Sequence, residues 1–260
     1  MTPALAVRGV TRRYGALVAV DAVDFAVAPG EVHAVIGPNG AGKSTFLAML
    51  AGETRPDAGS IRLDGADVTH LGAAARARRG IGRAFQTTAV VRDFTVLRNA
   101  LLAAVAGRGR GFGMARAVMR DRRLLADAHA LLARVGLTGE ADRPAGALAH
   151  GQQRQLELAM ALAGRPGVLL LDEPTAGTGP EESRAMVALL QAIRRGEIRL
   201  ADGDDPVPPA MVLVEHDLDA VFALADRITV LAQGRVIACG PPDAVRSDPA
   251  VRRAYLGDDE

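Results

Sequence analysis

Residues 37–45 have the composition of a loop that binds phosphate groups. They satisfy the pattern G-x-x-x-x-G-K-[ST] through Gly37, Gly42, Lys43 and Ser44. Glycines let backbone N–H groups point inward around an anion, and Lys43 is expected to reach the β and γ phosphates of a nucleotide. The Ser44 hydroxyl is a candidate ligand for Mg²⁺. The pattern predicts a nucleotide site whose contacts come from Gly37, Pro38, Asn39, Gly40, Ala41, Gly42, Lys43, Ser44 and Thr45.

Two acidic residues, Asp172 and Glu173, follow an apolar segment at residues 168–171. An acid at the end of a buried strand can hold Mg²⁺ directly or through water, so Asp172 is a second candidate metal ligand. Glu173 is expected to act as the general base for the water that attacks the γ-phosphate. The pair therefore predicts hydrolysis of a nucleoside triphosphate.

An α/β framework is required to hold these side chains, and the N-terminal part of the sequence predicts one. A continuous apolar strand at residues 32–36 leads into the loop, and a helix at residues 46–51, which Gly52 terminates, follows it. Shorter strands are predicted at residues 5–7 and 22–28. Strand, glycine loop and helix is the order that a phosphate loop requires.

Helical spacing of apolar residues replaces the strand pattern between residues 87 and 165. The predicted helical segments there are residues 96–106, 115–135 and 152–163. Strands return at residues 168–171, 211–214 and 228–231, with helices at residues 180–195 and 217–225, and a turn at Gln233 and Gly234 leads into residues 235–238. We therefore expect a nucleotide-binding core in two parts, residues 1–86 and 166–260, interrupted by a helical subdomain at residues 87–165.

The composition limits the class of protein. The chain has 260 residues, of which 49% are hydrophobic, and 31 Lys and Arg residues stand against 30 Asp and Glu residues. This balance gives no reason to expect nucleic acid as a partner. Cys239 is the single cysteine, the N-terminal residues lack the pattern of a signal peptide, and no apolar run is long enough to span a bilayer. We expect a cytoplasmic protein that would serve a membrane process from outside the bilayer.

Four further motifs occur in a fixed order around the phosphate loop and the acidic pair. They are Tyr14 in a Tyr-Gly pair, Phe85-Gln86, Leu148-Ala149-His150-Gly151-Gln152, and Val214-Glu215-His216-Asp217. With this order of motifs, nearly the whole chain resembles the ATP-binding subunits of ABC transporters. The resemblance implies an α/β P-loop NTPase core of the ABC ATPase type, with an N-terminal antiparallel β region and an inserted helical subdomain.

The resemblance also implies a role for each motif. Tyr14 would stack on adenine, Gln86 would act in catalysis and bind Mg²⁺, and His216 would contact the γ-phosphate alongside Lys43 and Glu173. The signature segment, residues 148–152, would contact ATP bound to a second ATPase subunit through Ala149, His150, Gly151 and Gln152. Integral membrane permease subunits, and indirectly a solute-binding protein, would complete the assembly on the inner face of the cell membrane, with ATP and Mg²⁺ as its cofactors.

A narrower resemblance is carried by residues 80–86, 108–134, 151–157 and 254–257. These segments are similar to the ATPases of branched-chain amino acid importers, in particular to the one with the longer helical insert. Three alternatives stay open: a urea or amide importer, a lipopolysaccharide exporter, and a soluble ABC ATPase without a transport role. The near-neutral charge and the lack of sustained heptads argue against the last.

Three positions depart from the usual family pattern. Ala149 and His150 replace the usual Ser and Gly of the signature segment, so a hydroxyl donor toward the γ-phosphate is missing. Gly179 replaces the usual acid of the D-loop, for which residues 176–180 are the counterpart. Residues 196–209 are predicted to form a long exposed loop.

Overall fold

The computed structural model describes residues 2–84, 90–107, 121–198 and 208–256. Within these residues, ten strands form two sheets. The larger sheet has the order β10 (Arg235–Gly240), β9 (Arg227–Ala232), β3 (Val32–Ile36), β8 (Ala210–Val214), β7 (Val168–Asp172) and β6 (Ile81–Ala84). The smaller sheet is antiparallel and has the order β2 (Leu17–Val27), β1 (Leu5–Tyr14), β4 (Ala58–Leu63) and β5 (Ala66–Asp67).

The larger sheet is parallel from β9 to β6, and only β10 pairs antiparallel among its described strands. Its central strands, β3, β8 and β7, are buried on both faces. In β7, Leu169 and Leu171 pack into one hydrophobic cluster, while Val168 and Leu170 pack into another on the opposite face. Burial on both faces explains why these strands are continuous apolar runs in the sequence.

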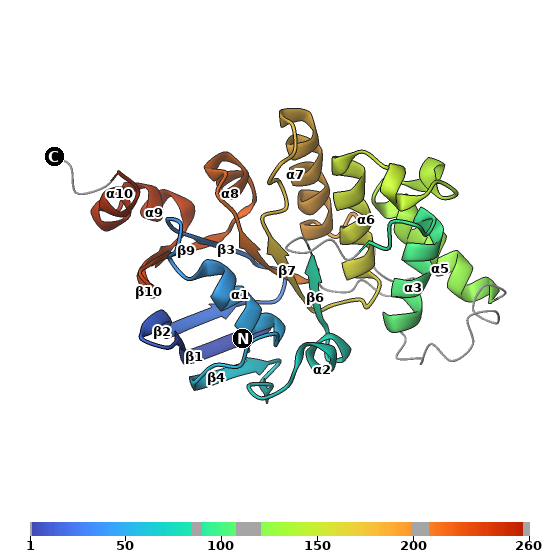
Figure 1. Ribbon diagram of the computed structural model, residues 1–260. Helices are drawn as coiled ribbons and strands as arrows, with labels where there is room; N and C mark the ends of the chain where they lie inside the picture. Colours follow the sequence, from blue (N-terminus) through green and yellow to red (C-terminus); the bar gives the residue numbers. More distant parts are fainter. Residues whose placement is uncertain (1, 85–89, 108–120, 199–207, 257–260) are drawn as a thin grey trace.

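Helix α1 (Lys43–Ala51) lies between the two sheets (Figure 1). Phe46, Leu47, Met49 and Leu50 are all buried there, in the cluster that joins the smaller sheet to the larger one. The helix begins at Lys43 rather than at residue 46, and it ends at Gly52, whose left-handed backbone has a φ of 81°. The prediction that Gly52 terminates this helix is confirmed.

The helices outside this core fall into two groups. Helices α3 (Val96–Gly107), α5 (Arg122–Arg134) and α6 (His150–Leu162) pack together beyond the β6 edge of the larger sheet (Figure 1). The helices of the other group pack into the hydrophobic cluster on the face of the larger sheet opposite to α1. They are α7 (Pro180–Arg194), α8 (Leu218–Leu224), α9 (Pro242–Ser247) and α10 (Pro249–Leu256). None of the described helices has both the length and the apolar character needed to cross a bilayer.

Three strands and three α-helices were missed by the sequence analysis: β4, β5, β6, α2 (Ala73–Arg78), α9 and α10. All have eight residues or fewer, so too few positions are available for a strand or helix period to dominate their pattern. Strand β6 pairs in parallel with β7, and Ile81 lies opposite Val168. The predicted segments at residues 108–120 and 199–207 lie outside the described residues.

Candidate nucleotide site

Three strand ends meet at the carboxyl edge of the larger sheet. Val214 of β8 is aligned with Val35 of β3 on one side and with Asp172 of β7 on the other. The phosphate loop follows β3, the acidic pair lies at the end of β7, and His216 follows β8. In parallel α/β sheets this edge is where ligands bind.

The phosphate loop packs closely against β2 and β9. This close packing requires glycine at two positions of the loop. A Cβ atom on Gly42 would lie 2.2 Å from the carbonyl oxygen of Ala19 in β2. A Cβ atom on Gly37 would lie 2.0 Å from the carbonyl oxygen of Leu231 in β9. Both glycines also have positive φ values, 99° and 151°, that other residues rarely adopt. Any larger residue at either position would displace the loop.

Lys43 is held inside this loop. Its Nζ donates hydrogen bonds to the carbonyl oxygens of Gly37 at 2.8 Å and Pro38 at 3.0 Å. Burial lowers the pKa of Lys43, although the nearby carboxylates of Glu173 and Asp172 act in the opposite direction. The remaining loop residues are more open, since Asn39, Gly40 and Ser44 are exposed and Thr45 is half-buried. Exposed residues around a fixed ammonium suit a loop that binds phosphate.

The turn from β9 to β10 supports the loop from behind. The backbone N–H of Gly234 donates to the carbonyl oxygen of Ala41 at 3.0 Å, and Gly234 in turn accepts a bond from Asp21 at 2.8 Å. The sequence analysis identified Gly234 as part of a turn but did not connect it with the phosphate loop. No local pattern links residues so far apart in the chain.

Asp172 is buried at the end of β7, with a side chain 3% exposed. Burial raises its pKa, and Arg83, whose Nη2 lies 3.3 Å from Oδ2, partly offsets this shift. Arg83 also forms an ion pair with Glu53. The sequence analysis missed Arg83 as a member of the site. The carboxylate of Asp172 and the hydroxyl of Ser44 are hard oxygen donors, which is the donor chemistry that Mg²⁺ prefers.

Glu173 and His216 face each other at this edge. His216 Nε2 lies 3.0 Å from Glu173 Oε1, and both side chains are partly exposed, at 43% and 37% respectively. Glu173 has a positive φ of 54°, a backbone conformation that costs a non-glycine residue roughly 1–2 kcal/mol. Its N–H donates to the carbonyl oxygen of Val214 at 2.8 Å, which anchors it to β8. Two residues widely separated in the sequence are thus in contact.

The signature segment lies apart from the phosphate loop. Helix α6 begins at His150, and the N–H of Ala149 donates to Gln152 Oε1 at 3.1 Å. A Cβ atom on Gly151 would lie 2.8 Å from Glu182 Cδ, so α6 and α7 approach closely at this point. Between described residues, no hydrogen bond or ion pair joins residues 149–152 to residues 37–45.

Tyr14 and Gln86 are the two remaining predicted site residues. Tyr14 lies at the end of β1 and is 48% exposed, with the guanidinium carbon of Arg12 at 4.7 Å from the centroid of its ring. An exposed ring at this place is available for stacking. Gln86 lies outside the described residues.

The motifs and their geometry agree with comparisons to known proteins. The family model described as "ABC transporter" matches residues 20–176. The chain belongs to the ABC transporter family. A second model, described as "Branched-chain amino acid ATP-binding cassette transporter", matches residues 235–260 of this ABC transporter protein.

The curated relatives of this ABC transporter protein match it along nearly its whole length. The high-affinity branched-chain amino acid transport ATP-binding protein BraF of Pseudomonas aeruginosa is 37% identical, with 98% of each chain covered. LivG of Escherichia coli K12, which has the same description, is 36% identical with the same coverage. The family resemblance inferred from the motifs is therefore confirmed.

Solved structures confirm the predicted ABC ATPase fold. A nucleotide-free ATP-binding cassette from an ABC transporter has a TM-score of 0.84 and 27% identity, covering 98% of this chain and 100% of that one. The ADP conformation of MJ1267, another such cassette, has a TM-score of 0.83 and the same identity, covering 99% and 100%. This ABC transporter protein is thus an ATP-binding cassette of the P-loop NTPase fold.

Proposed function

We propose that this chain binds and hydrolyses ATP and thereby powers the uptake of branched-chain amino acids or related small solutes through separate membrane subunits. The observation that carries the hydrolytic part is the contact of 3.0 Å between Glu173 and His216. This contact supports the proposal because it occurs at the same sheet edge as the phosphate loop, where we expect the γ-phosphate to be bound.

Each residue has a distinct task in the proposed reaction. Lys43 binds the β and γ phosphates, and Tyr14 stacks on the adenine ring. Glu173 accepts a proton from the attacking water, and His216 holds the γ-phosphate and orients Glu173. Mg²⁺, held by Ser44, Asp172 and Gln86, would offset negative charge on the phosphates.

The complete site is proposed to require a second ATPase subunit. Ala149 and His150 are exposed. Between described residues, no hydrogen bond or ion pair joins residues 149–152 to the phosphate loop of the same chain. A head-to-tail dimer would bring this segment of one subunit to the ATP bound by the other. In this arrangement residues 87–165 act as the helical subdomain, inserted between the two parts of the core at residues 1–86 and 166–260.

The proposed solute rests on two comparisons. The C-terminal residues 235–260 match a model for branched-chain amino acid cassettes, and BraF and LivG are named as transport proteins for these amino acids. Permease subunits and, through them, a solute-binding protein follow as partners. The protein would then be attached to the inner face of the cell membrane by its permease.

Purification of the full chain with its membrane partners tests this function. Membrane proteins that co-purify would be identified by mass spectrometry, and the complex would be reconstituted in liposomes. We expect ATP hydrolysis that increases when leucine, isoleucine or valine is supplied with the solute-binding protein. The Glu173→Gln variant should still bind ATP. Its rate of ATP hydrolysis should be lower by about a hundredfold or more, because an amide is a poor general base.

Other outcomes would reject parts of the proposal. If only urea or amides stimulate hydrolysis, the proposed solute is wrong. If the co-purifying membrane protein is a lipopolysaccharide exporter, the proposed direction of transport is wrong. Hydrolysis at the parent rate by Glu173→Gln would remove Glu173 from the catalytic role.

A further inference from the structure

Glu215 is a buried carboxylate that the sequence analysis assigned no task. It lies between β8 and His216, and its exposed fraction is 3%. Its Oε1 accepts two bonds from Thr175, one from the backbone N–H at 2.8 Å and one from the hydroxyl at 2.5 Å. Its Oε2 accepts bonds from the backbone N–H groups of His216 at 2.9 Å and Asp217 at 3.3 Å. One side chain thus joins two separate segments of the site.

The two segments are those that carry the facing pair Glu173 and His216. Thr175 belongs to residues 173–179, the β7–α7 connection, which begins with Glu173. His216 is fixed on its other side as well, because Asp217 caps α8 by accepting bonds from the backbone N–H groups of Asp219 at 2.9 Å and Ala220 at 3.3 Å. The backbones on both sides of the pair are therefore tied to Glu215.

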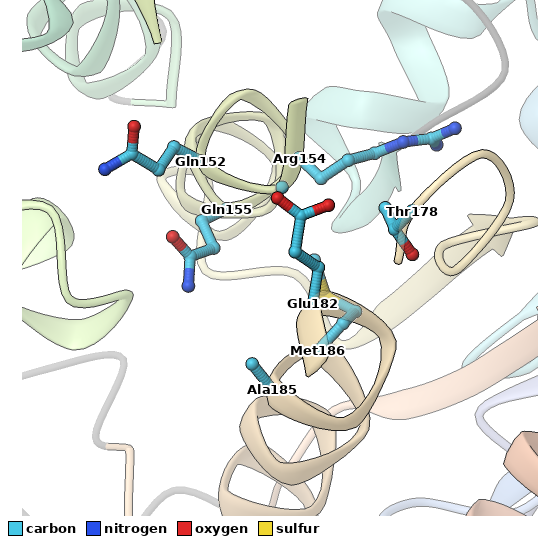
Figure 2. Close-up of a pocket in the computed structure, with 8 residues that line it drawn as sticks. Gln152, Arg154, Gln155, Thr178, Glu182, Ala185 and Met186 are labelled. Carbon is cyan, nitrogen blue, oxygen red and sulfur yellow. The ribbon is translucent and has the colours of Figure 1, made fainter. Parts of the chain in front are cut away.

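The β7–α7 connection is also held from the signature helix. Arg154 of α6 donates to the carbonyl oxygen of Ala176 at 3.2 Å. Figure 2 shows its side chain extending from α6 toward the loop that carries Thr178, above Glu182 of α7. A pocket of about 170 Å³ lies between the starts of α6 and α7 and includes Thr178 in its lining. The connection thus lies between Arg154 on one side and Glu215 on the other.

We propose that Glu215 is a positioning residue for ATP hydrolysis, whose carboxylate holds the β7–α7 connection against the backbone of His216 and so keeps Glu173 and His216 in register. The proposal rests on the proposed ATPase function and adds a residue to it. Glu215 touches neither nucleotide nor water in this role. It acts through the placement of two side chains, and small misplacements of reacting groups are costly in rate.

Two variants break this tie with little change in shape. In Glu215→Gln, one end of the side chain becomes an NH₂ group, which faces N–H donors whichever way the amide is turned. In Thr175→Val, only the hydroxyl donor is lost, and Thr175→Ser restores it. Thr69→Val is the matched control, because Thr69, like Thr175, is buried, and its hydroxyl is hydrogen-bonded to Ile61 in the smaller sheet.

The experiment measures kcat and KM for ATP with the full chain in its membrane complex, ATP affinity by calorimetry, and thermal unfolding. Glu215→Gln and Thr175→Val should lower kcat by about tenfold to a hundredfold. ATP affinity should stay within about twofold of the parent, and Thr175→Ser should restore turnover. Thr69→Val should lower the unfolding temperature and leave kcat at the parent value.

A double-mutant cycle separates positioning from a general loss of structure. In the His216→Ala background, Thr175→Val should change kcat by less than about twofold, because Glu173 then has no His216 side chain with which to be kept in register. The inference is overturned if the two effects multiply independently, or if Thr175→Val and Glu215→Gln turn over at the parent rate. A parent complex that does not hydrolyse ATP would instead reject the proposed function. If Glu215→Gln does not fold, the Thr175 series alone decides.

Discussion

Lys43 is the only lysine in the sequence, and its Nζ donates to two carbonyl oxygens of the phosphate loop. We expect Lys43→Ala to weaken ATP binding by about tenfold to a hundredfold, because a hydrogen bond to a charged group contributes roughly 1.5–3 kcal/mol. Calorimetry on the folded variant measures this change. Unchanged ATP affinity would show that the loop does not bind phosphate.

The absence of other lysines from the sequence provides a second measurement of the same contact. An amine-selective reagent can react with one side chain only, Lys43, besides the N-terminal amine. Burial lowers the pKa of Lys43 and so increases the fraction of reactive amine. ATP should slow labelling of Lys43 but not of the N-terminus. Lys43→Arg is the control, in which side-chain labelling should disappear while the positive charge remains.

Ala149 precedes the first residue of α6, where Ser is among the preferred N-cap residues. Ala149→Ser should therefore have two effects. It should stabilise the helix by about 1 kcal/mol through the cap, and it should tighten an ATP-bound dimer by up to about tenfold or somewhat more through a new bond to the γ-phosphate. Sedimentation of Glu173→Gln with and without Ala149→Ser, in ATP and in ADP, measures the dimer, and thermal unfolding of the monomer measures the cap.

The nucleotide dependence separates the two effects of Ala149→Ser. The cap should stabilise helix α6 equally in ATP and in ADP. The new bond from Ser to the γ-phosphate can form only in ATP, because ADP has no γ-phosphate. Equal tightening in ATP and ADP would contradict the γ-phosphate explanation. His150 is the alternative donor, and its Nε2 would lie 3.6 Å from a Cβ atom on Gly177. If the dimer tightens in neither nucleotide, His150 already supplies this bond.

Helix α1 is held at its C-terminal end by a buried arginine from α2. Arg76 Nη1 donates to the carbonyl oxygens of Met49 at 2.6 Å and Leu50 at 2.8 Å, and its other nitrogens donate to Leu71 and Thr69. These bonds satisfy carbonyl groups that a helix leaves without partners at its end. Since α1 begins directly after Gly42 of the phosphate loop, the arginine supports the loop through the helix.

We expect Arg76→Met to lower the free energy of unfolding by about 3 kcal/mol or more, because it leaves several buried carbonyl groups without donors. Denaturant unfolding measures this loss. Arg78→Met is the matched control, since Arg78 lies exposed on the same helix and its replacement should change stability by less than about 0.5 kcal/mol. Equal effects of the two variants would contradict the capping role of Arg76.

The two sheets are connected through His33 of β3. Its Nδ1 lies 2.9 Å from the carbonyl oxygen of Ala26 in β2, and its Nε2 lies 2.8 Å from Thr229 Oγ1 in β9. Burial lowers the pKa of His33 from its ordinary value of 6.5 to about 4, and the positive charge of Arg227 contributes to the shift. The folded protein therefore holds this imidazole neutral at a pH where the unfolded chain binds a proton.

The stability of the whole molecule should depend on pH through His33. Its contribution is fully present above pH 6.5 and is lost as the pH falls from 6.5 toward about 4, by roughly 3 kcal/mol in total. Denaturant unfolding of the parent and of His33→Gln, at a series of pH values, measures the difference. The variant should be less stable at pH 7 but should lose less stability on acidification. Parallel pH curves for the two proteins would exclude His33 as the cause.

The sequence by itself determined the parts of this protein that are written in continuous segments. The phosphate loop is one such segment, because its glycines, Lys43 and the flanking strand and helix are all local. The buried strands were predictable for a similar reason, since burial on both faces demands an uninterrupted apolar run. The order of the motifs indicated the family, because each motif is itself a short continuous segment. The roles of the individual site residues stay predictions.

The tertiary structure decided which distant residues meet. The contacts of Arg83 with Asp172, of Glu215 with Thr175 and of Gly234 with Ala41 join residues far apart in the chain. Isolated polar residues carry no periodic signal, so nothing in the sequence distinguishes a buried partner such as Arg76 from an exposed arginine such as Arg78. Strand β6 and the order of the larger sheet depend likewise on pairing between distant segments. Local patterns specify elements, whereas the packing of elements brings the catalytic pair and its supports together.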